Sequence, residues 1–126
     1  MGKIPNSLFS HPSLQILDLS NNQFSGQLIE FSNASFLEYL YLDNNHLDGP
    51  IPVSISELHG LEELSLGSNK FNNSLNLSVI QQLKNLSYLD LSHTNLLSEY
   101  NDFNFSLSSV PLEELILASC KLKKNS

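Results

Sequence analysis

Tyrosines and carboxylates at repeated spacings are the residues most able to do chemistry in this sequence, and that chemistry is recognition. Tyr39 and Tyr41 form a Tyr-x-Tyr pair, and Glu63 and Tyr88 follow at similar intervals along the chain. Aromatic faces beside acids can hold a basic residue of a peptide or protein partner. The candidate ligand-binding residues are Tyr39, Tyr41, Asp43, Glu63, Ser65, Tyr88, Asp90 and His93. The alternative is that each is an ordinary solvated side chain.

Patterns for catalysis or metal binding are missing from the sequence. Its four histidines fall at unrelated positions, and no His, Cys or Asp cluster has metal-ligand spacing. Phosphate-loop, nucleophile-elbow and kinase signatures do not occur either. Asp90, Ser92 and His93 supply the residue types of a catalytic triad, but they occupy exposed, variable positions of a repeat. The sequence therefore predicts no enzyme, no cofactor and no metal site.

The acidic net charge argues against one class of partner. The chain carries 13 acidic residues against 6 Lys plus Arg, a formal charge of −7, whereas nucleic acid binding needs clustered cations. The acidity indicates either solubility or an acidic docking face. The single cysteine, Cys120, excludes an internal disulfide, and no apolar run is long enough to span a membrane.

A leucine pattern repeats through the chain and must position these side chains. Units open at Leu14, Leu37, Leu61, Leu86 and Leu112, so the period is 23 to 26 residues. Leucines follow at offsets three and five, a turn residue at offset eight and an apolar residue at offset ten. This L-x-x-L-x-L-x-x-N/C-x-L pattern is that of a leucine-rich repeat. Residues 1–13 match the second half of a unit. We therefore expect a single repeat array over 1–126, which is a piece of a longer array or the product of a truncated reading frame.

The L-x-L core of each unit alternates, so it predicts a short strand whose leucines point inward and whose intervening residues point outward. Each unit buries its leucines only against its neighbours. We expect an α/β solenoid, a curved right-handed superhelix with a parallel concave β-sheet and an irregular or short-helical convex side. The candidate ligand-binding residues fall on the outward face of these strands or just after them.

The offset-eight residues predict a hydrogen-bonded ladder at the bend after each strand. They are Asn22, Asn45, Asn69, Thr94 and Cys120. An asparagine amide can bond buried backbone groups of the bend. Threonine and cysteine offer fewer such bonds, so the ladder should weaken in the last two units.

The second halves of the units predict less regular structure. Pro50 and Pro52 favour extended backbone after the turn, and therefore a second short strand on the flank. A helical turn is expected within 54–59 and a helix over 77–83. Residues 98–105 replace the proline-containing half of the fourth unit, and they form either an irregular return loop or a displayed binding loop.

Five N-glycosylation sequons lie outside the predicted strands and favour a secreted parent protein. Their acceptor residues are Asn33, Asn72, Asn76, Asn85 and Asn104. Asn72 and Asn76 are so close in sequence that a glycan on one would crowd the other.

The motif from Leu37 to Pro52, L-x-x-L-x-L-x-x-N-x-L-x-G-x-I-P, resembles the plant-specific extracellular class of leucine-rich repeats, and the likeness covers essentially the whole chain. That class builds the ectodomains of plant receptor-like kinases and receptor-like proteins, and the polygalacturonase inhibitors. The passage from Leu112 to Leu122 looks most like receptor-like proteins, with the Verticillium-wilt resistance type as the nearest comparison.

The resemblance implies a non-catalytic recognition module, a piece of the ligand-binding ectodomain of a plant cell-surface immune or developmental receptor. It implies a protein or peptide ligand and allows a co-receptor kinase as a second partner. It also implies that the parent protein lies at the extracellular side of the plasma membrane. We expect the segment itself to carry no signal peptide or membrane anchor. The alternatives are a secreted inhibitor of a cell-wall hydrolase, and a truncated non-functional product or intracellular repeat.

Overall fold

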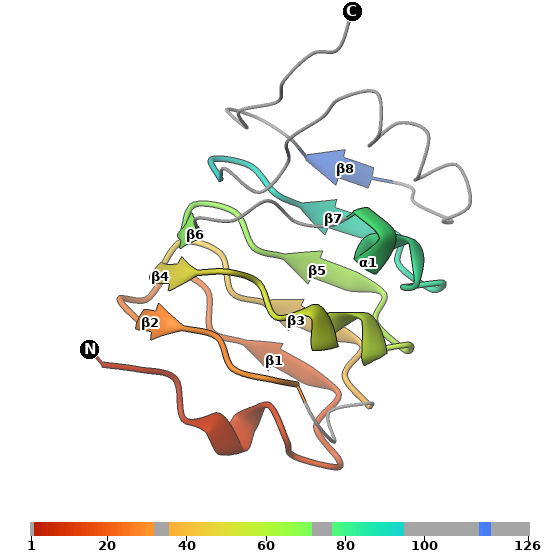
Figure 1. Cartoon of the computed structure of the whole chain (residues 1–126), viewed down its shortest axis with the longest axis horizontal. Helices are drawn as coiled ribbons and strands as arrows, with labels where there is room; N and C mark the ends of the chain where they lie inside the picture. The colour runs from red at the N-terminus through yellow and green to blue at the C-terminus, as the bar shows by residue number, and fades with distance from the viewer. Residues whose placement is uncertain (1, 32–35, 72–76, 95–113, 117–126) are drawn as a thin grey trace, which may run out of the picture.

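Two parallel sheets run side by side through the computed structural model, which describes residues 2–31, 36–71, 77–94 and 114–116 (Figure 1). The inner sheet has the order β1-β3-β5-β7-β8, with strands Ile16–Asp18, Tyr39–Tyr41, Glu63–Ser65, Tyr88–Asp90 and Glu114–Ile116. The flanking sheet has the order β2-β4-β6, with strands Ser25–Gln27, His46–Gly49 and Lys70–Phe71. Every neighbouring pair of strands is parallel, as the repeat pattern predicts.

The leucine spacing sets which side of the inner sheet is buried. The central residues Leu17, Leu40, Leu64 and Leu89 are aligned by the strand register, and all four are buried. The residues on either side of each central leucine point the other way, because successive side chains of a strand alternate between faces. The inner sheet therefore has one leucine face and one open face.

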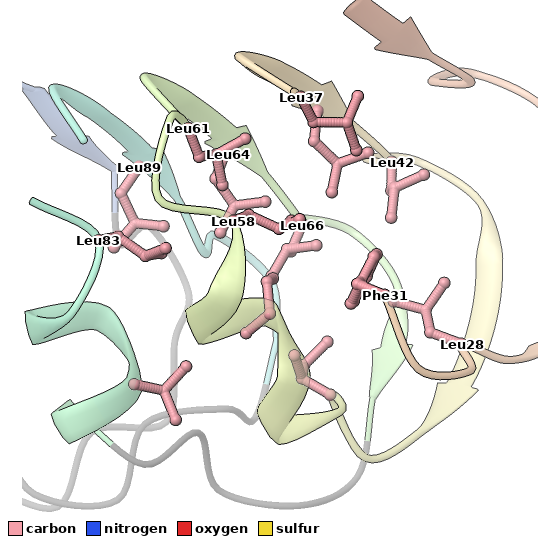
Figure 2. Close-up of a cluster of buried hydrophobic side chains, with 14 of the residues drawn as sticks. Leu28, Phe31, Leu37, Leu42, Leu58, Leu61, Leu64, Leu66, Leu83 and Leu89 are labelled. Carbon is pink, nitrogen blue, oxygen red and sulfur yellow. The ribbon is translucent and has the colours of Figure 1, made fainter. Parts of the chain in front are cut away.

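The core lies between the leucine face of the inner sheet and the return segments (Figure 2). Leu64 and Leu66 reach it from the β5 unit, while Leu58 and Leu83 reach it from the return side. A buried hydrogen bond crosses between units as well, since the backbone N–H of Phe31 donates to Ser54 Oγ at 2.9 Å. Each unit is thus held by apolar contacts with its neighbours and by bonds between them.

The return segments contain short helices. These are the 3₁₀ helices η1 (Asn6–Leu8) and η2 (Val53–Glu57) and the α-helix α1 (Leu77–Gln81). The helical turn expected within 54–59 is confirmed by η2, and the helix expected over 77–83 is confirmed by α1, which ends two residues earlier; η1 was not predicted. In the part of the chain that the structure describes, no helix has the length and apolar character needed to cross a membrane. The loop predicted at 98–105 and Cys120 both lie outside the described residues.

The short flanking strand expected in the second unit is present as β4, but the prolines do not form it. β4 ends at Gly49, before Pro50, and Pro52 follows in extended backbone just before η2. Proline has no N–H with which to continue a ladder. Gly49 also has a φ of +75°, and a Cβ there would lie 2.5 Å from Gln27 Cγ on the neighbouring strand. Glycine therefore allows the strand to end in close contact with β2.

Candidate functional site

The open face of the inner sheet carries an ordered grid of polar and aromatic side chains. Register pairs Tyr39 of β3 with Glu63 of β5, and Glu63 in turn with Tyr88 of β7. One step along the strands, Tyr41 pairs with Asp18 on one side and with Ser65 on the other. Rings and carboxylates thus alternate along the row from Tyr39 to Tyr88, across strands whose backbones are spaced at about 4.8 Å.

Two tyrosines and one glutamate form the centre of this grid, and we name them the tyrosine–glutamate cluster: Tyr39, Tyr41 and Glu63. The rings of Tyr39 and Tyr41 stack with their planes 7° apart and their centroids 6.4 Å apart. Tyr41 donates its phenolic O–H to Glu63 Oε1 at 2.5 Å. All three side chains are half-buried. The cluster is therefore held by contacts within the sheet and keeps part of its surface open to a partner.

Carboxylates around the cluster raise the pKa of both phenols. The pKa of Tyr39 lies above its ordinary value of 10.0 because of the negative charge of Glu62 first, then partial burial, then Glu63 and Glu38. The pKa of Tyr41 is raised chiefly by burial, and further by its hydrogen bond to Glu63 and the charge of that carboxylate. Both side chains therefore remain neutral hydrogen-bonding phenols under physiological conditions.

These raised pKa values predict a stability loss in alkali. The folded chain holds the two phenolic protons more tightly than the unfolded chain, so this stabilisation is complete below the ordinary pKa and is lost as the pH rises above it. We expect the free energy of unfolding, measured in urea, to be lower at about pH 11 than at about pH 9. Tyr41→Phe should shrink that difference and remove the latest-ionising component of the tyrosinate absorbance. Equal titration curves for the folded and denatured chain would contradict the prediction.

Three predicted ligand-binding residues differ from the open, strand-like positions that we expected: Ser65, Asp90 and His93. Ser65 was expected to face outward, but it is only 4% exposed, because its short side chain lies between the larger residues of β3 and β7. Asp90 Oδ1 accepts the backbone N–H of Ser92 at 2.9 Å and so closes a turn. His93 is exposed, but its backbone is left-handed, with a φ of +55°. Tyr88 and Asp43 are half-buried.

A glycine beside β5 allows the turn at Asp90 to form. A Cβ on Gly67 would lie 2.8 Å from Ser92 Oγ, 2.9 Å from Ser92 O and 3.0 Å from Asp90 Oδ1. The missing side chain therefore lets two neighbouring units approach each other closely. Part of the surface that we expected to be open for a ligand is occupied by these contacts within the chain.

Glu38 and Glu62 also act on the cluster, although the sequence pattern did not select them. They stand at offset one, just before the strands, and the Glu62 N–H donates to Glu38 O at 2.7 Å. The parallel ladder thus begins at these residues and brings both carboxylates near Tyr39, whose pKa they raise. The available signal was the Leu-Glu pair that opens two successive units, at Leu37 and Leu61.

The offset-eight asparagines lie at the bend and bond the backbone of two units at once. Asn45 Nδ2 donates to Leu19 O, Leu42 O and Asp43 O at 3.0–3.3 Å, and its Oδ1 accepts the Phe24 N–H at 3.1 Å. Asn69 repeats this arrangement one unit later, with Leu42, Leu66 and Gly67 as acceptors and the Leu47 N–H as donor. Asn22 Nδ2 donates to Leu19 O and Ser20 O. The shorter side chain of Thr94 donates to Leu91 O at 2.6 Å.

One of the predicted glycosylation sites, Asn85, can be placed in the structure. Its side chain is exposed, and its Nδ2 donates to His59 O at 2.9 Å. The amide nitrogen carries two hydrogens, so it can keep this bond after a sugar replaces the other hydrogen. Asn33, Asn72, Asn76 and Asn104 lie outside the described residues, as does Cys120 of the turn ladder.

A hollow of about 670 Å³ lies at the bend edge, away from the tyrosine–glutamate cluster. It is lined by Asn21, Asn22, Gln23, Asn44, Asn45 and His46. Most of its amides already bond the chain, including Asn44 Nδ2 to Asn21 Oδ1 at 2.7 Å. No group of three His, Cys, Asp or Glu side chains within the described residues could hold a metal. The sheet face therefore remains the stronger candidate for ligand recognition.

Comparison with known proteins identifies similar sequences and folds. A family model described as "Leucine rich repeat" matches residues 35–97, and a second with the same description matches 13–33. Receptor like protein 24 of Arabidopsis thaliana is 38% identical over 93% of this chain. The chain spans only 14% of the length of that relative.

Solved structures align over nearly the whole chain. The Arabidopsis receptor kinase HAESA, in complex with the peptide hormone IDA and the co-receptor SERK1, is 34% identical over 96% of this chain and 20% of its own, with a TM-score of 0.84. A plant ice-binding protein aligns equally well, with a TM-score of 0.85 and 27% identity over 96% of this chain and 39% of its own. Since these two proteins have different roles, the shared backbone alone does not identify a ligand.

Proposed function

The chain belongs to the leucine-rich repeat family, and from this premise we propose that it forms part of the ligand-recognition ectodomain of a plant cell-surface immune or developmental receptor. The observation that carries the proposal is the tyrosine–glutamate cluster, which is ordered by stacking and hydrogen bonding on the open face of a sheet with a leucine core. Aromatic side chains that are already held in place bind a partner with little further loss of entropy.

The ligand that this face suits is a protein or a peptide. We infer that the face recognises the ligand without catalysing a reaction. Tyr39 and Tyr41 have raised pKa values, so they serve as neutral hydrogen-bonding groups and ring surfaces rather than as bases. By analogy with HAESA, which is seen with a peptide hormone and a co-receptor, a co-receptor kinase is proposed as a second partner. The receptor-like relative favours this function over inhibition of a cell-wall hydrolase. Extracellular placement and N-glycosylation at Asn85 are part of the same proposal.

Selection of peptide ligands tests this function. Short randomised peptides displayed on phage would be selected on the immobilised chain, and single clones would then be measured against variants. We expect Tyr39→Ala combined with Tyr88→Ala to weaken binding by about tenfold or more, because aromatic residues carry much of the energy of such interfaces.

The matched control removes two exposed apolar side chains outside the inner sheet, with Ile29→Ala combined with Val53→Ala. Circular dichroism would verify that both double variants retain the fold. Equal loss of binding in the two double variants, or no selected peptide that depends on the inner face, would contradict the proposed function.

A further inference from the structure

The charges along the open face of the inner sheet are all negative in the described residues. Across the four repeat segments 14–20, 37–43, 61–67 and 86–92 the carboxylates are Asp18, Glu38, Asp43, Glu62, Glu63 and Asp90. No lysine or arginine occurs in these segments. The described cations lie elsewhere: Lys3 precedes η1, Lys70 is in β6 and Lys84 follows α1. A ligand on this face therefore meets carboxylates without a competing cation from the same strands.

The stacked rings provide a place for a flat cation among these carboxylates. A cation interacts favourably with an aromatic face within about 6 Å of the ring centroid. The centroids of Tyr39 and Tyr41 are 6.4 Å apart, so one cation can lie within that range of both rings. Glu63 belongs to the same cluster, and its carboxylate has lone pairs beyond the one that accepts the Tyr41 hydroxyl.

We propose that this face binds an arginine side chain of an extended peptide, with the guanidinium against Tyr39 and Tyr41 and paired with Glu62 and Glu63. The inference rests on the function proposed above and specifies the chemistry of its ligand. Arginine suits the site better than lysine, because its planar guanidinium stacks on rings and presents several donors in a fixed geometry. A second cation of the extended chain has a place beside Asp18, which is exposed and pairs with Tyr41 across β1 and β3.

Other occupants fit the face less well. A second copy of the chain would bring another formal charge of −7 and a second row of carboxylates against the first, and like charges facing each other are unfavourable. Nucleic acid is disfavoured for the same reason, since its phosphates repel the face. A basic peptide is the partner whose charge complements the carboxylates.

A synthetic heptapeptide, acetyl-Gly-Ser-Arg-Gly-Arg-Ser-Gly-amide, is the probe for this inference. Binding would be followed by NMR on the whole chain carrying isotope-labelled tyrosine. We expect the peptide to shift the ring signals of Tyr39 and Tyr41. The same peptide with citrulline in place of arginine should leave those signals unchanged, since citrulline keeps the shape and loses the charge. The lysine version should bind about threefold or more weakly than the arginine version.

Two double variants that remove the same charge test whether binding depends on this site or only on the net charge of the chain. Glu62→Gln with Glu63→Gln should weaken binding of the arginine peptide by about tenfold. Asp48→Asn with Glu57→Gln changes the net charge equally at exposed positions on β4 and η2, and should alter affinity by less than about twofold. Tyr39→Phe should retain most of the binding and Tyr39→Leu should lose it, because only the first keeps a ring.

The outcomes distinguish this inference from the function on which it rests. If library peptides bind the inner face but carry no excess of arginine, or citrulline binds as well as arginine, the arginine site is wrong and peptide recognition stands. If neither the library nor the arginine peptide depends on the inner face, both proposals fail. If the control pair loses as much affinity as the glutamate pair, the attraction is nonspecific and the proposed site is wrong.

Discussion

Replacement of Asn45 by alanine is expected to lower the free energy of unfolding by about 3 kcal/mol, because several buried backbone groups lose their partners together. The Asn45 side chain is only 6% exposed, and it bonds one N–H and three carbonyls. Two of these partners, Phe24 and Leu19, belong to the preceding unit, so the bonds join neighbouring units as well as closing a bend. Urea unfolding followed by circular dichroism measures the loss as a lower midpoint at unchanged slope.

Two further variants test the mechanism of that loss. Asn22→Ala removes a half-buried amide with two bonds to carbonyls and should cost about 1 kcal/mol. Asn45→Thr should fall between wild type and Asn45→Ala, because Thr94 bonds a carbonyl of its own bend from the equivalent position. If Asn45→Ala costs no more than Asn22→Ala, the bonds that join the units contribute little to stability.

The inner strands could be predicted because a single physical requirement repeats along the chain. Leucines separated by one residue must share a face in a strand, and the same two offsets recur in every unit, so β1, β3, β5 and β7 follow directly from the spacing. The flanking strand of the second unit was less predictable. Its position depends on where Gly49 takes a positive φ against Gln27, which is a contact between units that local propensity does not contain.

The face of the sheet that carries the candidate site was predictable, but the contacts between its side chains were not. Alternation placed Tyr39, Tyr41 and Glu63 on the open face, but it did not show that the Tyr41 hydroxyl would bond Glu63. It also gave no sign that Ser65 would be covered by its larger neighbours. Burial on a strand face depends on the size of the side chains on both neighbouring strands, so a single repeat does not determine it. Whether these residues bind a ligand stays a prediction.

Leu64→Ala should produce the largest stability loss of the core substitutions, about 4 kcal/mol, because a fully buried leucine leaves a cavity when it is truncated. Leu64 is 0% exposed and stands at the centre of β5, which pairs with β3 on one side and with β7 on the other. In a stacked array each unit is stabilised by its immediate neighbours. A cavity at this position therefore weakens two contacts between units, and the urea midpoint should fall accordingly.

Leu17→Ala is the matched control, since it removes the same side chain from the same position of another repeat. Leu17 is 6% exposed, and β1 pairs only with β3 among the described strands. We expect a loss of about 2 kcal/mol there, because β1 has a paired strand on one side only among the described strands. Equal losses at Leu17 and Leu64 would mean that stability does not depend on the number of neighbouring units. Leu17→Ala should also leave the tyrosine–glutamate cluster in place, because β1 carries none of its residues. Leu64→Ala should disturb the cluster, because Glu63 directly precedes Leu64 and depends on the position of β5.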